Sequence, residues 1–493
     1  MSMNVPPEII DFINGNWGKS LIIKGSPGSG KTTLALEIMS YAMGKNGAIY
    51  FSTRQGDQSL YHQFPWLKFE DYKNVIIDTS YEFLETLGSR NEDVIDLPSD
   101  AEKINASRKF LGSIRDGVEP ILSLNNIMKL NVKRKEFYRL VYLLKSKFKP
   151  GLVLIIDSIE GIAQRWNVTK VELMDAIQKD LVESSGMNVI IVSEQNDSGG
   201  AIDVLEYLVD GVIRLEKKLI ENRITRLLMF DKLRFVESKN VIHNYTLAGG
   251  RFNYFDQTLY SNIQKYKLRS NGDKINLGFQ ELDALINGEL KVNSAIIESG
   301  NFPQQFFVYI LAPLIVKSVN KNVGVIMFCD PNLDANDEFN ILTNFGDPKI
   351  LSDKLRIADF SSEFAGKKYI IPMGYEDQSI RERELAKVIV DLMDNSDYIL
   401  HIYRLSGIER IYGNIRVEDN ISKMISSIRP KRDKMLLIND VGRLDESISR
   451  LGNIIFRSKY LGRIPIIYSD LPFTPFYGLQ LNENGELFMQ AIE

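Results

Sequence analysis

The chain has 493 residues, which is long for one hydrophobic core and predicts two or three domains. Its formal net charge is -4 and Cys329 is its one cysteine, so nothing in the composition points to general nucleic-acid binding, and a disulfide framework or thiolate metal cluster is excluded. No apolar run is long enough to cross a membrane and the first residues do not resemble a signal peptide, so we expect a cytoplasmic protein.

The first half of the chain alternates short apolar runs with helical patterns. Continuous rather than alternating hydrophobicity is typical of strands buried on both faces, as in a parallel sheet covered by helices. This order of elements predicts a doubly wound α/β domain. The expected strands are residues 20–25, 47–53, 74–79, 152–157, 188–193, 211–216 and 226–233.

The sequence GSPGSGKT follows the first expected strand and fits the pattern G-x-x-x-x-G-K-[ST]. The glycines let the backbone wrap a phosphate group and direct N–H groups at it. Lys31 supplies a positive charge to the β- and γ-phosphates, and the Thr32 hydroxyl can bind Mg²⁺. The motif predicts a nucleoside triphosphate site formed by Gly25, Ser26, Pro27, Gly28, Ser29, Gly30, Lys31, Thr32 and Thr33.

Polar residues stand at the ends of two further buried strands. Asp157 closes a long apolar run, where an unpaired carboxylate would be costly, so we expect it to bind Mg²⁺ together with Thr32. The next strand ends in Ser193, Glu194 and Gln195. Since ligands of such sheets lie outside the carboxyl ends of the strands, we expect one of these three side chains to sense the γ-phosphate.

A long segment without clear strands, about residues 80–150, predicts a helical insertion in the first domain. Within it, residues 129–149 have the pattern of an amphipathic helix with many lysines and arginines on one side. A solvated helix face is the simpler interpretation, and a patch for nucleic acid or for an acidic partner is the alternative. The acidic balance of the whole chain favours the solvated face.

The second half repeats the order of the first, which predicts an internal duplication. A polar segment at 261–276 is the natural linker, so we expect domains at 1–262 and 263–493. The second domain is expected to be degenerate and to bind no ATP, because the residues that would carry the chemistry are replaced. The expected replacements are Gln304 and Gln305 for Lys31, Tyr403 for Asp157, and Asp470 and Pro472 for Lys232 and Arg234.

With these motifs placed, the chain resembles the KaiC-like branch of the RecA/RadA ATPases. The resemblance rests on the segments SLIIKGSPGSGKTTLALEI, LVLIIDS, VLEYLVDGVIRLE and KLRF, and it is strong in the first half and weak in the second. The family includes members with two domains in tandem. Among narrower groups, the arrangement is similar to the archaeal gas-vesicle regulator GvpD-like P-loop proteins. The resemblance implies a RecA-type core that assembles into rings, often hexamers, with ATP between subunits.

Lys232 and Arg234 gain a role from this resemblance. They lie two residues apart in one expected strand, so their side chains share a face, and alone this pattern is more often a solvated edge than a catalytic pair. In the family, the K-x-R pair of one subunit reaches the γ-phosphate held by the next subunit. The resemblance therefore implies that this pair acts on the nucleotide of a neighbouring copy, alongside Lys31 of that copy.

One departure from the family concerns the attacking water. Family members place glutamates after the second strand, where this chain has Arg54 and Gln55, and neither can act as a general base at neutral pH. Gln55 can orient a water molecule, and Asp57 or Glu194 can substitute as the base if the geometry allows. Hydrolysis of ATP to ADP and phosphate is therefore expected to be slow, or to depend on assembly.

Three functions remain open at this stage. The first is a regulatory ATPase, in which ATP at the first domain controls homo-oligomer assembly and the binding of a protein partner. The second is a DNA-binding relative or motor of the recombinase group, which would need clustered basic residues and is therefore less favoured. The third is a structural scaffold with a vestigial ATP site. The complete motif set of the first domain argues against the third.

Overall fold

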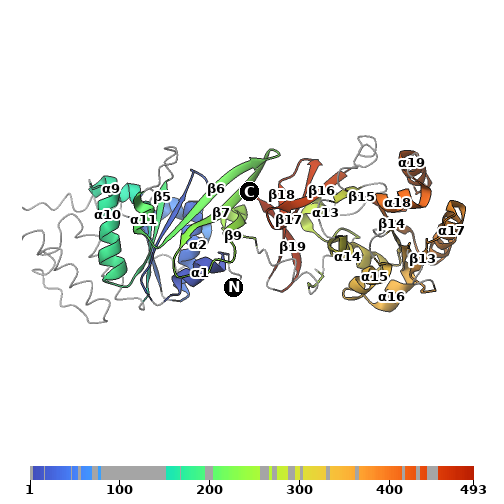
Figure 1. The fold of residues 1–493 in the computed structure, drawn as a ribbon, viewed down its shortest axis with the longest axis horizontal. Coiled ribbons are helices and arrows are strands. Elements are labelled where there is room, and N and C mark those ends of the chain that lie inside the picture. The colour runs from blue at the N-terminus through green and yellow to red at the C-terminus, as the bar shows by residue number, and fades with distance from the viewer. Residues whose placement is uncertain are drawn as a thin grey trace, which may run out of the picture. The chain divides into compact units, whose positions relative to one another are not determined.

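The structure is a computed structural model of the chain, and it divides into two compact units (Figure 1). One unit holds residues 3–254 with Glu493, and the other holds residues 255–492. The described residues are 4–15, 17–45, 47–53, 57–68, 76–78, 151–166, 168–194, 204–255, 266–268, 275–286, 295–299, 304–328, 334–360, 366–413, 417–428, 433–440, 454–482 and 484–493.

The first unit is built on one nine-stranded sheet. Its strands are β1 (Ser20–Gly25), β2 (Ala48–Ser52), β3 (Ile76–Asp78), β4 (Val153–Asp157), β5 (Asn188–Glu194), β6 (Gly211–Ile220), β7 (Arg223–Leu233), β8 (Ile242–Thr246) and β9 (Asn253–Tyr254). They lie in the order β3-β2-β4-β5-β1-β6-β7-β8-β9. In this spatial order, the first six strands, β3-β2-β4-β5-β1-β6, are parallel to one another. From β6 onward, β7, β8 and β9 each run antiparallel to the strand before them.

Helices cover both faces of this sheet, as Figure 1 shows. The helices are α1 (Pro7–Ile13), α2 (Lys31–Met43), α3 (Asp57–Gln63), η1 (Pro65–Lys68), α9 (Ile159–Trp166), α10 (Lys170–Ala176), η3 (Ile177–Glu183), α11 (Val204–Leu208) and η4 (Ala248–Gly250). Side chains of α1 and α2 pack on one face with Ile23 and Val192. Side chains of α9, α10 and α11 pack on the other face with Ile22 and Ile156. The continuous apolar runs are thus buried on both sides, which confirms the predicted α/β class.

The second unit has a ten-stranded sheet of the same design. Its strands are β10 (Ala295–Ser299), β11 (Gly324–Phe328), β12 (Leu355–Asp359), β13 (Ile370–Pro372), β14 (Ile399–Arg404), β15 (Lys434–Asp440), β16 (Ile454–Leu461), β17 (Ile464–Leu471), β18 (Phe476–Leu481) and β19 (Leu487–Ile492). Their order is β13-β12-β11-β14-β15-β10-β16-β17-β18-β19. If β10 replaces β1, β14 replaces β4 and β15 replaces β5, this is the order of the first sheet with β13 added at one edge.

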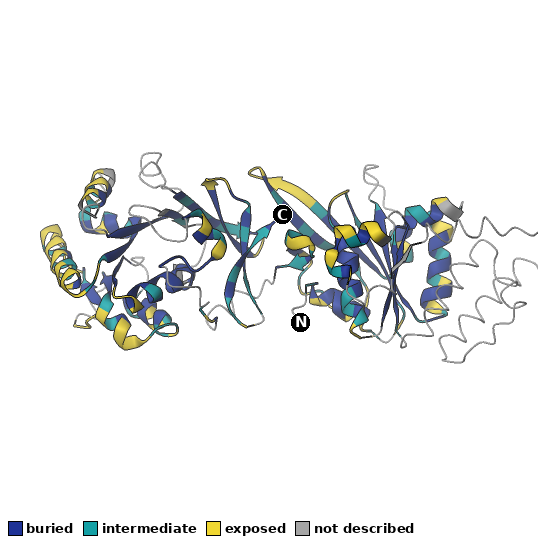
Figure 2. Cartoon of the chain, turned by 180° about the vertical axis from the view of Figure 1, so that it is seen from behind, coloured by how far each residue is buried: buried dark blue, intermediate teal, exposed yellow. Residues whose placement is uncertain are grey.

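Helices also cover both faces of the second sheet. They are α13 (Gln280–Leu285), α14 (Gln304–Asn320), α15 (Ala335–Thr343), α16 (Pro348–Lys354), α17 (Gln378–Asn395), α18 (Leu405–Tyr412) and α19 (Val417–Ile428). One core cluster joins α13, α14, α15 and α16 to the sheet, and another joins α17, α18 and α19 to the opposite face. Figure 2 shows central strands in buried dark blue in each unit, with exposed yellow on outward faces of helices.

The two sheets share an irregularity at the same place. The pairing of β6 with β7 shifts by one residue between Val212 and Ile213, and the pairing of β16 with β17 shifts between Ile455 and Phe456. The extra residue is an aspartate in both bulges, and it forms an ion pair with an arginine of the neighbouring strand. The pairs are Arg214–Asp231 and Arg457–Asp470, each with an N–O distance of 2.8 Å. A shared strand order and a shared bulge support the predicted duplication.

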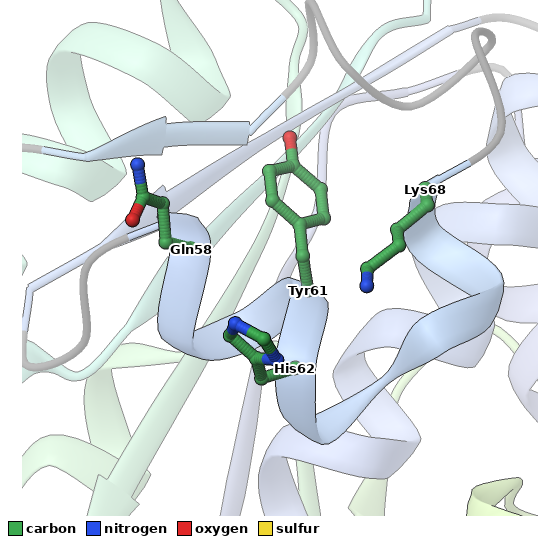
Figure 3. A pocket seen from close by; sticks show the side chains of 4 residues that line it. All are labelled: Gln58, Tyr61, His62 and Lys68. Atoms are coloured by element: carbon green, nitrogen blue, oxygen red, sulfur yellow. The ribbon is translucent and has the colours of Figure 1, made fainter.

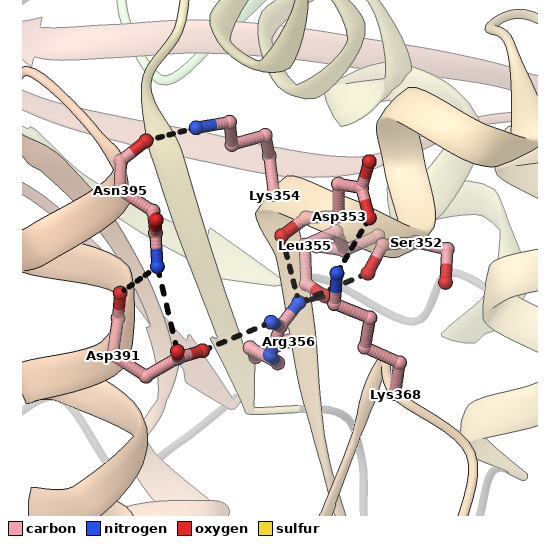
Figure 4. A network of polar contacts seen from close by, with 8 residues as sticks. All are labelled: Ser352, Asp353, Lys354, Leu355, Arg356, Lys368, Asp391 and Asn395. Carbon is pink, nitrogen blue, oxygen red and sulfur yellow. Dashed lines mark hydrogen bonds and ion pairs between the residues drawn. The ribbon is translucent and has the colours of Figure 1, made fainter.

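A buried arginine ties two helices to the second sheet (Figure 4). Arg356 is the second residue of β12, and its side chain is 5% exposed. Its Nη1 donates to the backbone carbonyls of Ser352, Asp353 and Leu355 at 3.0, 3.1 and 3.0 Å. These carbonyls lie at the end of α16, where helical partners run out. Nη2 donates to Asp391 of α17 at 3.2 Å. One guanidinium therefore satisfies the end of α16 and fixes α17 beside it.

We predict that Arg356→Met lowers the free energy of unfolding of the second unit by about 2–3 kcal/mol, because carbonyl and carboxylate groups lose a charged donor. Native-state hydrogen exchange of β12 peptides measures this change within the full chain. Lys349→Met, at an exposed position of α16, is the control and should leave the exchange unchanged. Equal protection of β12 in both variants would contradict the prediction.

Candidate nucleotide-binding site

The candidate phosphate loop, residues 25–30, connects β1 to α2 in the middle of the first sheet. A Cβ atom at Gly25 would lie 2.5 Å from the backbone oxygen of Leu215. Gly30 has a φ of 91°, and a Cβ there would lie 2.9 Å from the side chain of Leu247. Both positions therefore require glycine, the first because of close backbone approach and the second because of both its conformation and its packing.

Lys31 begins α2 and lies against the loop that precedes it. Its Nζ donates to the backbone oxygens of Gly25 at 2.7 Å and Ser26 at 3.2 Å, and the residue is buried. No acidic residue occupies the first turn of α2. The helix N-terminus and the ammonium group thus place positive potential at the loop without a competing carboxylate in that turn, as an anion site needs.

The two residues predicted to bind Mg²⁺ come together although their elements are not neighbours. Thr32 lies in α2 and Asp157 ends β4, with β5 between β4 and β1. The Thr32 hydroxyl donates to Asp157 Oδ2 at 2.6 Å. Among the residues that the structure describes, no group of three or more His, Cys, Asp or Glu side chains is placed to hold a metal. A hydroxyl and one carboxylate suit Mg²⁺ that takes its other ligands from phosphate and water.

Two residues that the sequence did not reveal support Asp157. The Tyr50 hydroxyl, from β2, donates to Asp157 Oδ2 at 2.7 Å. Burial, together with the neighbouring carboxylate charge, raises the pKa of Tyr50 well above its usual value, so its hydroxyl remains a donor. Thr53 accepts from the backbone N–H of Ser158 at 2.8 Å, and its own N–H donates to the Asp157 carbonyl at 2.8 Å. These contacts hold the carboxylate by its side chain and by its backbone.

The three residues predicted to sense the γ-phosphate, Ser193, Glu194 and Gln195, are placed differently by the structure. The Ser193 hydroxyl donates to Oε1 of Glu160 in α9, at 2.7 Å, on the sheet face opposite α2. Glu194 is the next residue of β5, so its side chain leaves on the α2 side. Gln195 and Gln55 lie outside the described residues. A sensing role for this group of residues stays a prediction, and the position of Glu194 fits it better than that of Ser193.

The Lys232 and Arg234 pair lies on the face of the sheet that α11 covers. Lys232 pairs with Val212 of β6, which pairs with Ile22 of β1, three residues before Gly25. The bulge in β7 turns Lys232 toward α9, α10 and α11, whereas α2 and the loop it follows lie on the other face. The pair is therefore not directed at the phosphate loop of its own chain.

Both cations of the pair bind the segment that contains α11. Lys232 Nζ donates to the backbone oxygens of Glu206 and Val209 at 2.9 and 2.5 Å. Nη1 of Arg234 lies 3.7 Å from Oδ1 of Asp210, and the Arg234 side chain is 55% exposed. Burial and the neighbouring Arg234 charge lower the pKa of Lys232 from its usual value. The arrangement leaves the Arg234 guanidinium accessible at the surface.

The second unit places a cation where the first has its carboxylate. The match between the two sheets follows from residues that pair across three neighbouring strands. In the first sheet these strands are β1, β5 and β4, and the residues lie on the face that α2 covers. In the second sheet they are β10, β15 and β14, and the residues lie on the face that α14 covers. The rows of paired residues are Ile23–Val192–Asp157 in the first sheet and Ile297–Ile438–Arg404 in the second. Arg404, not Tyr403, therefore takes the place of Asp157, and the sequence prediction was wrong by one residue. Comparison of the two halves of the sequence could not reveal this shift, because the register of a strand is set by its pairing with neighbouring strands.

Arg404 and an aromatic ring fill the equivalent of the metal site. The Arg404 side chain is 3% exposed, and its guanidinium carbon lies 5.8 Å from the ring centre of Phe307 in α14. Phe306 beside it is also buried. A guanidinium repels Mg²⁺, and two phenylalanines replace the hydroxyl-bearing turn of α2. The geometry supports the prediction that the second unit binds no Mg·ATP.

The register also corrects the expected replacements for Lys232 and Arg234. Leu471 pairs with Ile455 as Lys232 pairs with Val212, so Leu471 takes the place of Lys232. Phe473 then takes the place of Arg234. The sequence prediction named Asp470 and Pro472, but Asp470 is the bulge residue that matches Asp231. Leu471 and Phe473 are 70% and 59% exposed, so two apolar side chains stand where the first unit has two cations.

A pocket of about 420 Å³ lies beside α3 and η1 (Figure 3). Its described lining residues are Gln58, Tyr61, His62 and Lys68, and Figure 3 shows Lys68 extending toward Tyr61. None of these described residues belongs to the phosphate loop or to the Asp157 cluster.

Over the described helices, none is both long and apolar enough to cross a membrane.

Comparison with known proteins agrees with this site. Residues 9–231 match the family described as "GvpD gas vesicle protein, P-loop domain". Protein GvpD2 of Halobacterium salinarum is 22% identical over 515 residues, which cover 98% of this chain and 94% of the relative. Protein GvpD1 of the same organism is 20% identical over 548 residues, covering 98% and 95%. The chain thus carries a P-loop domain similar to that of GvpD proteins, and its similarity to two such proteins extends through both units.

Proposed function

We propose that this chain is a regulatory ATPase, in which ATP bound at the first unit controls self-assembly and the binding of a protein partner, and in which hydrolysis is slow. The observation that carries the proposal is the contrast between the two units. One brings Lys31, Thr32 and Asp157 together, whereas the other has Arg404 against Phe307 at the equivalent place. The proposal therefore assigns one nucleotide site to each chain, with the second unit as a scaffold or a surface for the partner.

The residues of the first unit fit ATP and Mg²⁺. Glycine is required at Gly25 and Gly30, which keeps the loop backbone open to phosphate oxygens. Thr32 and Asp157 would hold Mg²⁺, which neutralises charge on the β- and γ-phosphates. Lys31 contributes the fixed cation of the site, and Tyr50 keeps the Asp157 carboxylate aimed at Thr32.

Slow hydrolysis is proposed because Arg54 and Gln55 follow β2 in the sequence, where members of the KaiC-like family place glutamates that activate water. Glu194 is the carboxylate of β5 that leaves on the α2 side, and it is our candidate for activating water. Gln55 can only orient water, because an amide does not take up a proton at neutral pH. The chain is therefore expected to hold ATP for longer than an efficient ATPase does.

Assembly would complete the site. Within one chain, Lys232 and Arg234 contact the segment from Glu206 to Asp210 and face away from the loop. Their role as cations for phosphate is thus proposed to be exercised in a neighbouring copy, as in RecA-type rings. Since the similar proteins are gas vesicle proteins, the first protein partners to test are components of gas vesicles.

We predict that Lys31→Ala abolishes ATP-dependent assembly, because the loop loses its fixed cation. Light scattering of the full chain with and without Mg·ATP measures the mass. The wild type should gain mass with Mg·ATP and the variant should not, whereas Lys45→Ala, at an exposed position just beyond α2, should behave like the wild type. Identical masses in the wild type with and without nucleotide would refute the assembly proposal.

We predict that Tyr50→Phe weakens Mg²⁺ binding to the ATP complex about tenfold, because the metal ligand loses its supporting hydrogen bond. Mg²⁺ titrations of a fluorescent ATP analogue provide the measurement. Tyr41→Phe is the matched control, since the Tyr41 hydroxyl accepts from Asn14 on the outer side of α2. The same Mg²⁺ dependence in both variants would show that Tyr50 does not support the metal ligand.

We predict that subunits with complementary defects restore hydrolysis when mixed. A Lys31→Ala chain lacks its own site but keeps Lys232 and Arg234, and a Lys232→Ala/Arg234→Ala chain has the opposite defect. The mixture should hydrolyse ATP faster than either variant alone, measured as phosphate release. Additive rates in the mixture would place the action of the pair within one chain.

A further inference from the structure

The hairpin of β7 and β8 contacts the candidate phosphate loop through two consecutive carbonyls. Arg226, in β7, donates from Nη1 to the backbone oxygen of Gly28 at 2.8 Å. Tyr245, in β8, donates from its hydroxyl to the backbone oxygen of Ser29. Arg226 is 7% exposed and Tyr245 is fully buried. Two buried donors therefore hold adjacent peptide groups of a loop that otherwise has a glycine-rich, flexible sequence.

Further contacts fix the two donors. The Tyr245 ring stacks on Phe252 with ring centres 4.6 Å apart, and burial raises the pKa of Tyr245, so its hydroxyl stays protonated. Arg226 Nε donates to the backbone oxygen of Glu493, so the guanidinium bridges two carbonyls. The side chain of Leu247 packs against Gly30, where a Cβ would come within 2.9 Å. The support is thus rigid on the hairpin side.

The orientation of these carbonyls sets the orientation of the loop amides. In a trans peptide the C=O and the following N–H point in opposite directions. When Tyr245 holds the Ser29 carbonyl toward the hairpin, the N–H of Gly30 is directed away from the hairpin. A loop that binds phosphate needs its N–H groups on one side, and fixed carbonyls reduce the conformational entropy that binding would otherwise cost.

We propose that Arg226 and Tyr245 are positioning residues of the nucleotide site. They hold the carbonyls of Gly28 and Ser29 on the hairpin side. The Ser29 carbonyl thereby directs the Gly30 N–H toward the phosphate side, while the Ser29 N–H donates to the Ser26 carbonyl at 3.2 Å and closes the turn of the loop. This inference rests on the proposed function, because it requires that the loop bind a nucleotide. Neither residue touches the phosphates, and both act through the loop backbone.

Nucleotide affinity tests the proposal, with Arg223→Met as the matched control. Arg223 is a buried arginine of the same strand whose Nη1 donates to the Glu221 carbonyl at the β6–β7 turn. Arg226→Met should weaken binding of fluorescent ATP and ADP analogues about tenfold, and Arg223→Met should leave it unchanged. Arg226→Lys, which keeps one donor for Gly28, should recover part of the loss. Equal affinities for Arg226→Met and the wild type, or equal losses for both methionine variants, would overturn the proposal.

Hydrogen exchange without nucleotide supplies the second measurement. Arg226→Met should speed exchange of peptides that cover residues 25–31 while the amides of β4 keep wild-type rates. If β4 also exchanges faster, the variant has lost its fold, and Tyr245→Phe, which removes one hydroxyl, decides instead. Unchanged loop exchange in the folded variant would refute the positioning role. Failure of the wild type to bind either analogue would overturn the proposed function, whereas the exchange result would still judge the support of the loop.

Discussion

The shared carboxylate of Asp157 is the constraint on which the first unit depends. Its Oδ2 accepts hydrogen bonds from Thr32 and Tyr50, which belong to α2 and β2, and its backbone is fixed by Thr53. A carboxylate at the end of a fully apolar strand is costly unless such donors surround it. Meeting this requirement draws the carboxyl ends of β2 and β4 and the start of α2 to one point. The phosphate loop ends at that same point.

The second unit has the same fold without a carboxylate at the position equivalent to Asp157. Strand order, the bulge and its Arg–Asp pair are all retained, because they close the sheet regardless of any ligand. At the position of the carboxylate the second unit has Arg404, 5.8 Å from the ring centre of Phe307, and at the positions of the two cations it exposes Leu471 and Phe473. The two units thus share their sheet architecture while they differ in the side chains at the site.

Sequence reasoning succeeded where the signal was local and failed where it depended on distant partners. The apolar runs predicted the central strands, and the glycine-lysine spacing predicted the loop at Gly25 to Lys31. Tyr50 was hidden inside a strand whose apolar neighbours explained it fully, and Arg226 resembled an ordinary charged strand residue. Their roles come from backbone and side-chain groups more than 100 positions away. The register of a strand likewise depends on its neighbours in the sheet. The sequence prediction therefore named Tyr403 as the replacement for Asp157, one residue before Arg404.

The bulge at Asp231 has a consequence for how this chain can vary in length. β7 carries Arg226 on the α2 face and Lys232 on the opposite face, although both are even-numbered residues of one strand. Without the extra residue, strict alternation would put both side chains on the same face. Insertions or deletions of one residue between them would exchange the partners of everything downstream. Relatives that keep both arginine and lysine in these roles must therefore conserve the parity of the spacing between them, whatever the identities of the residues in between.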